Sequence, residues 1–140
     1  TYKATQVQAD KRKNTFTANI ATAYPAEAEV ESWIRSYSLQ KGQLRISDSF
    51  RLTTAKQPNQ INFMTWGQVN TEIPGKIQLE VKGKKAFIEY DKQLFDVKTE
   101  TIPLTDPRLS NVWGKSIYRI TLTATNIYKT GNYSFIIKKQ

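Results

Sequence analysis

Neither histidine nor cysteine occurs among the 140 residues of the chain. Without cysteine there can be no disulfide, no thiol nucleophile and no thiolate metal site. Without histidine the commonest general base and the commonest metal ligand are missing. Ser-His-Asp triads, Cys-His dyads and His-ligated zinc sites are therefore excluded. No apolar run approaches the ~20 residues of a membrane-spanning helix, and no signal peptide is visible. We expect no cofactor, no metal site and no membrane span.

The β character of the sequence is clear throughout. Runs rich in Thr, Tyr, Ile, Phe and Val alternate in polarity and are separated by Gly, Pro, Asn and Asp. About nine or ten strands at a spacing of roughly ten residues are typical of an antiparallel β-sandwich. The length suits one domain, over residues 1–140. The expected strands cover residues 4–9, 15–20, 26–39, 43–52, 61–66, 76–82, 85–91, 93–103, 115–125 and 133–138, with 105–114 as the longest irregular stretch.

One acidic residue falls on an apolar strand face. Asp48 alternates in phase with Ile46 and Phe50. A buried carboxylate is costly unless it is paired, so Asp48 needs a partner. A catalytic or metal-ligating role is one reading, and a structural ion pair is the other. Arg35, on the preceding strand, is the natural partner because strands of a hairpin face each other, so we favour the ion pair.

Basic residues exceed acidic ones by nine, with 21 Lys plus Arg against 12 Asp plus Glu. Lysines crowd the turn at 11–13, the turn at 82–85 and the chain end at 138–139. Lysines at such places also keep sheet edges from pairing, but the net charge still attracts polyanions. We do not expect nucleic acid as the partner, because no aromatic strand motif, glycine-rich clamp or recognition helix is present. An acidic polysaccharide remains the candidate.

Four residues are the candidate polysaccharide contacts. Arg45 and Arg51 flank two serines on an outward strand face, where guanidinium groups can hold carboxylates or sulfates. Trp113 lies in the long irregular stretch, and a tryptophan there either stacks on a sugar ring or plugs the end of the sandwich. Arg119 follows on the next strand.

Five segments, taken in order, resemble the C-terminal β-domain of the heparinase II/III-like family of polysaccharide lyases. They are TAYP at 22–25, VESWIR at 30–35, LRISDSF at 44–50, LTDPRL at 104–109 and WGKSIYRI at 113–120. The resemblance extends from about residue 15 to the end of the chain. Each motif is weak alone, and their order and spacing carry the similarity.

The resemblance implies a fold, a partner and a location. Family members place an α/α toroid before antiparallel β-sheets, are secreted or periplasmic, and cleave acidic polysaccharides by β-elimination. Their catalytic Tyr and His and their metal-binding His residues match no position here, so we expect this chain not to be an enzyme. It would be the C-terminal part of a longer lyase-like chain. Its expected partner is the upstream catalytic domain, with acidic polysaccharide as a further contact. A free-standing carbohydrate-binding module is the alternative.

Overall fold

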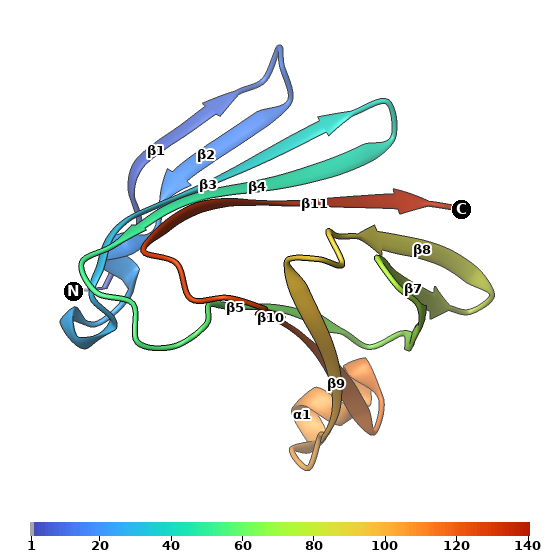
Figure 1. Cartoon of the computed structure of the whole chain (residues 1–140). Helices are drawn as coiled ribbons and strands as arrows, with labels where there is room; N and C mark the ends of the chain where they lie inside the picture. Colours follow the sequence, from blue (N-terminus) through green and yellow to red (C-terminus); the bar gives the residue numbers. More distant parts are fainter. Residues whose placement is uncertain (1) are drawn as a thin grey trace. The chain divides into compact units, whose positions relative to one another are not determined.

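The computed structural model describes residues 2–140, which form eleven strands, one α-helix and two short 3-10 helices (Figure 1). The fold class is all-β, with antiparallel sheets and a sandwich-like character, as the sequence predicts. The residues fall into two compact units. Unit 1 runs up to Pro58 and includes Ile127–Lys138, and unit 2 comprises Asn59–Asn126 and Lys139–Gln140. Each unit is described by itself.

Unit 1 contains five strands in the spatial order β1-β2-β3-β4-β11. They are β1 (Thr5–Asp10), β2 (Thr15–Asn19), β3 (Val30–Gln40), β4 (Gln43–Leu52) and β11 (Thr130–Lys139). β3 and β4 form a long hairpin closed by Lys41 and Gly42, both in the left-handed region, with φ values of 50° and 73°. Two left-handed residues make the tight turn that matches the twist of paired strands. The final strand, β11, pairs with β4 in unbroken register.

Three aromatic rings form the centre of the core of unit 1. The ring of Phe50 stacks on Trp33 at a centroid distance of 5.0 Å and lies 4.9 Å from the ring of Tyr133. Gly131 makes room for this ring, because a Cβ there would lie 2.9 Å from Cζ of Phe50. The other buried apolar residues of the unit are Ala18, Ala21, Ile46, Leu52 and Phe135.

The segment before β3 differs from the expectation of a strand over residues 26–39. Ala26–Ala28 form a 3-10 helix, and the strand begins only at Val30. Pro25 precedes the helix and Glu29 ends it in a left-handed conformation, with φ 52°. The helix-forming composition of this segment prevails over its two-residue period, because Pro25 has no backbone N–H to donate to a neighbouring strand and the left-handed Glu29 interrupts the extended chain.

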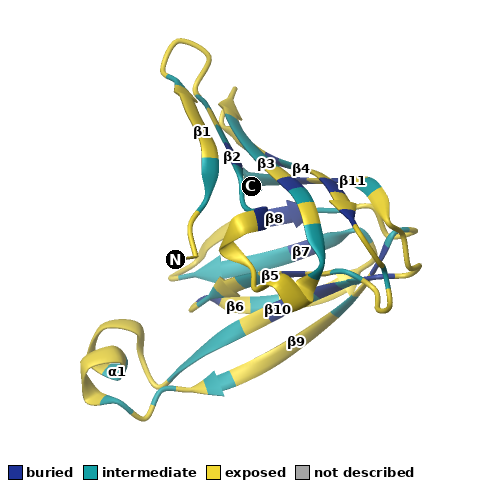
Figure 2. Cartoon of the chain, turned by 90° about the vertical axis from the view of Figure 1, so that its left-hand side faces the viewer, coloured by how far each residue is buried: buried dark blue, intermediate teal, exposed yellow. Residues whose placement is uncertain are grey.

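Unit 2 contains two groups of three strands and the helix. β6 (Gln68–Ile73), β7 (Lys76–Val81) and β8 (Lys84–Glu89) form a meander, with β7 in the middle. β5 (Gln60–Thr65) and β9 (Phe95–Pro103) flank β10 (Ser116–Ala124). β10 carries three buried residues and β8 two, whereas α1 (Pro107–Trp113) is largely exposed (Figure 2). The buried apolar residues are Ile61, Ile77, Phe87, Ile88, Phe95, Ile120, Leu122 and Ala124.

Two elements of unit 2 were not expected from the sequence. β6 occupies residues that showed no clear alternation, and α1 occupies the stretch expected to be irregular. These elements, and the later start of β3, are the main departures from the expected strands. Within residues 2–140, no helix is both long and apolar enough to cross a membrane.

Candidate functional site

The helix α1 is a short element with well-defined ends. Asp106 caps its N-terminus by accepting a hydrogen bond from the backbone N–H of Arg108 at 2.9 Å, and Pro107 occupies the first turn. Gly114 ends the helix with φ 89°, and its N–H donates to the carbonyl of Ser110. These are ordinary start and stop signals of a helix. The backbone hydrogen bond from Leu104 to Lys115, 2.8 Å long, closes the loop that carries α1 from β9 to β10.

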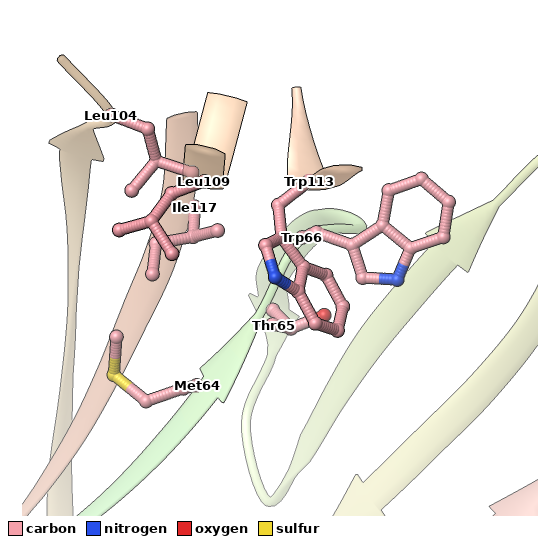
Figure 3. Close-up of a pocket in the computed structure, with 7 residues that line it drawn as sticks. All are labelled: Met64, Thr65, Trp66, Leu104, Leu109, Trp113 and Ile117. Carbon is pink, nitrogen blue, oxygen red and sulfur yellow. The ribbon is translucent and has the colours of Figure 1, made fainter. Parts of the chain in front are cut away.

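An apolar hollow of about 270 Å³ lies between α1 and the neighbouring strand ends of unit 2 (Figure 3). Trp66 and Trp113 meet edge to face on one side of it, with ring centroids 6.4 Å apart and planes at 73°. Four of its residues, the two tryptophans with Met64 and Leu109, are between 43% and 53% exposed. We call this the tryptophan hollow, and its lining residues are Met64, Thr65, Trp66, Leu104, Leu109, Trp113 and Ile117.

The backbone around Trp66 is fixed by a close approach of two strands. A Cβ on Gly67 would lie 2.5 Å from Cγ2 of Val81 and 2.8 Å from the carbonyl oxygen of Glu80, so only glycine fits there. The N–H of Gly67 also donates to the hydroxyl of Thr65 at 3.1 Å. Trp66 is thereby held at the end of β5, although it is not packed in a core.

The tryptophan hollow is chemically apolar with basic groups near its rim. Among the described residues that line it, the polar side-chain groups are the hydroxyl of Thr65, which accepts the hydrogen bond from Gly67, and the indole N–H groups of the two tryptophans. The Lys82 ammonium lies 6.0 Å from the ring centroid of Trp66, at the outer limit of a cation–π contact. Arg119 faces Met64 across the β5–β10 pair and forms an ion pair of 3.5 Å with Glu100 on β9. A hollow of this kind suits an apolar side chain better than a sugar hydroxyl, because it offers few hydrogen-bonding partners.

The four residues expected to contact polysaccharide divide between the two units. Trp113 lines the tryptophan hollow and Arg119 lies beside it, both in unit 2. Arg45 and Arg51 are exposed on β4 of unit 1, where Nη1 of Arg45 donates to the hydroxyl of Ser134 at 3.2 Å. Within unit 2, the structure therefore brings Trp113 of α1 and Arg119 of β10 to the tryptophan hollow, and within unit 1, Arg45 and Arg51 share the exposed face of β4.

Asp48 has the structural partner that its position indicates. Its carboxylate is buried and receives two hydrogen bonds from Arg35, on the register-paired position of β3. A carboxylate held in this way by a guanidinium has little capacity left for proton transfer or metal binding. Among residues 2–140, no group of three acidic side chains is placed to hold a metal ion.

Sequence reasoning found Trp113 but missed most of the hollow around it. The sequence pattern gives no reason to place Trp66 beside Trp113, or to single out the aliphatic residues Met64, Leu104, Leu109 and Ile117. A signal was available, since Asp106-Pro107 is a common helix start and Gly114 a common helix end. A short helix here would have set Leu109 and Trp113 four residues apart, on one face.

Comparison with known proteins leaves the chain without a family assignment. No protein-family model matches it, and no curated protein is significantly similar to it.

Proposed function

We propose that this chain is a non-catalytic β-domain of a polysaccharide-lyase-like protein, and that it packs against the catalytic domain of that protein. The family follows from the resemblance of five ordered segments to the C-terminal β-domain of heparinase II/III-like lyases. A secreted or periplasmic location follows from the same resemblance. The composition supports the non-catalytic role, because the chain has no histidine and no cysteine.

The tryptophan hollow is the observation that carries the proposal. Single exposed apolar residues are normal, but a cluster of them around a hollow marks an interaction surface. Tryptophan and methionine are among the residue types enriched at protein interfaces, and the hollow contains two tryptophans and one methionine. The hollow lacks the convergent polar groups that orient a small ligand, so an apolar side chain of a protein domain is its best-matched occupant.

The basic rim indicates the character of the partner surface. Lys82 and Arg119 lie at or near the hollow, and the whole chain carries an excess of nine positive charges. A catalytic domain that docks here should present an apolar anchor surrounded by carboxylates. Complementary charge at the rim of an interface raises the association rate and selects the partner.

Reconstitution tests this proposal directly. The polypeptide that precedes this chain in the full-length protein is produced separately and mixed with the 140-residue chain, and complex formation is followed by analytical ultracentrifugation. We expect a complex that Leu109→Ser with Trp113→Ala weakens about tenfold or more. Arg51→Gln, on β4 of unit 1, is the control and should leave the affinity unchanged. Absence of a complex, or a complex indifferent to the hollow variants, would overturn the docking role.

A free-standing carbohydrate-binding module is the second candidate, favoured by the exposed Trp66 with a lysine beside it. Binding of the chain to heparan sulfate, alginate and a neutral glucan across a salt series tests the module, whereas the reconstitution tests the docking role. Tight binding to one acidic polymer that survives moderate salt, together with no complex in the reconstitution, favours the module. Weak binding to any polyanion that disappears with salt is the behaviour of a diffuse positive field.

A further inference from the structure

A second hollow in unit 2 lies on one face of the β7–β8 hairpin. Leu79 faces Ala86 and Val81 faces Lys84 across the hairpin, and this face continues from the buried pair Ile77 and Ile88. The volume of about 610 Å³ is within the usual range of small-molecule sites, about 300–1,000 Å³. We call it the lysine hollow, and its lining residues are Thr65, Leu79, Val81, Gly83, Lys84, Lys85, Ala86, Lys139 and Gln140.

Two lysine clusters far apart in sequence meet at this hollow. The backbone N–H of Gln140 donates to the carbonyl of Lys85 at 3.2 Å, so the last residues lie beside β8. Lys139 thereby lines the same hollow as Lys84 and Lys85. This proximity is a product of the fold, because a sequence alone shows only two separate basic runs.

The charge of the lysine hollow is poorly balanced. Lys85 has one carboxylate neighbour, Glu80, with Nζ and Oε2 4.0 Å apart, which is a weak exposed pair. Among the described residues, Lys84 and Lys139 have no carboxylate partner. Lys85 faces Glu80 across the hairpin and so lies on the opposite face from the apolar floor, which leaves the unpaired ammonium groups of Lys84 and Lys139 at the hollow. Two unpaired ammonium groups beside an apolar floor form a site for anionic groups on a partly apolar framework.

The lysine hollow adjoins the tryptophan hollow. Thr65 lines both, and Lys82, at the tip of the same hairpin, reaches toward Trp66. An occupant of the lysine hollow therefore lies next to the surface on which we place the catalytic domain.

We propose that the lysine hollow binds the carboxylate or sulfate groups of an acidic polysaccharide at the edge of that domain interface. The polysaccharide as ligand class rests on the function proposed above. Lys84 and Lys139 would pair with the anionic groups, and the floor of Leu79, Val81 and Ala86 would contact the C–H faces of the sugar. Nucleic acid fits less well, because none of the described residues that line this hollow is aromatic and bases would have no ring to stack on.

Calorimetric titration of the 140-residue chain tests the site. The probes are size-defined fragments of heparan sulfate and alginate, a neutral glucan fragment of equal length, and a single-stranded oligonucleotide of equal charge. The test variant, Lys84→Gln with Lys139→Gln, removes two charges and keeps the Lys85–Glu80 pair. The control variant, Lys11→Gln with Lys13→Gln, removes two charges from the exposed turn after β1 and so has the same net charge.

The expected result is binding of an acidic fragment that the test variant weakens about tenfold or more and the control variant changes less than about twofold. In a plot of the logarithm of affinity against the logarithm of salt concentration, the slope should become shallower by about one unit for each lysine removed. Equal weakening by both variants would assign the binding to the overall charge and overturn the site. Tighter binding of the oligonucleotide would overturn the ligand class. Absence of binding to every acidic fragment at about 50 mM salt would overturn the inference altogether. None of these outcomes decides the docking role, which the reconstitution experiment measures separately.

Discussion

Arg35 and Asp48 form a two-pronged ion pair across the β3–β4 hairpin, with Nε 2.7 Å from Oδ1 and Nη2 2.6 Å from Oδ2. The Asp48 side chain has no exposed surface, whereas 24% of the Arg35 side chain is exposed. The hydrogen bonds that Arg35 donates to the Asp48 carboxylate raise the pKa of Arg35 above its ordinary value, against the opposing effect of burial. When folding raises the pKa of a base, the resulting contribution to stability is lost only as pH rises through that raised pKa. Arg35 therefore stays charged, and the ion pair keeps its contribution, at every pH at which the protein would ordinarily be studied.

Asp48→Ala should lower the free energy of unfolding by about 3 kcal/mol, because it leaves a half-buried guanidinium without a counter-charge. The double variant Arg35→Met with Asp48→Leu should recover most of that loss, since it removes both charges and keeps the volume. Urea unfolding followed by circular dichroism measures both changes. A double variant as unstable as the single one would show that packing, and not the unpaired charge, determines the cost.

Gly67→Ala should destabilise unit 2 by about 1–3 kcal/mol, because the added Cβ meets both a side chain and a backbone oxygen. Val81→Ala in the same chain should restore part of the stability, since it removes the 2.5 Å contact with Cγ2 but not the 2.8 Å contact with the Glu80 carbonyl. Thermal unfolding and the emission of Trp66 report the two effects. No loss of stability in the single variant would contradict the close approach of β7 to the end of β5.

Asp106 should titrate below its ordinary pKa of 3.8, because the side chain and then the backbone N–H of Arg108 donate hydrogen bonds to its carboxylate. Because folding lowers the pKa of Asp106, the cap stabilises α1 fully when the pH is above the pKa of the unfolded chain. This contribution is lost as the pH falls through the lower pKa of the folded chain. Carboxyl chemical shifts of the parent and of Arg108→Gln measure the difference. We expect the pKa of Asp106 to rise toward its ordinary value in the variant, and an unchanged pKa would exclude the guanidinium as the cause.

Acrylamide should quench two of the three tryptophans readily. Trp66 and Trp113 are 43% and 48% exposed, whereas Trp33 is 7% exposed and stacked on Phe50. Trp66→Phe and Trp113→Phe should each remove part of the quenchable emission, and Trp33→Phe should remove the protected part. Protection of all three in the 140-residue chain would mean that the tryptophan hollow is already covered by another copy.

β2 and β4 of unit 1 could be predicted closely because the alternation of their residues has a physical cause. β4 alternates between a buried and an exposed face over ten residues, and the same alternation identified Asp48 as a buried carboxylate with Arg35 opposite. Period-two patterning is reliable where one face of a strand is buried and the other is not.

The elements of unit 2 that form the tryptophan hollow carried a weaker signal. β6 is exposed on almost every residue, so its sequence shows no alternation. The helix α1 has no buried residue, and its apolar side chains look like an irregular run unless the capping residues are read first. A hollow assembled from β5, α1 and β10 also depends on contacts between residues up to about fifty positions apart, which local patterns do not encode.

β11 belongs to unit 1 in space but is synthesised after almost all of unit 2. Unit 1 consists of the first 58 residues and a last strand made after the bulk of unit 2. During synthesis, most of unit 2 can emerge and fold while β4 is paired only with β3 and still lacks β11 on its other side. Until Thr130–Lys139 leaves the ribosome, β4 is an open edge of ten residues, able to pair with the wrong strand. The sites where translation slows before the last strand should therefore influence the yield of correctly folded protein.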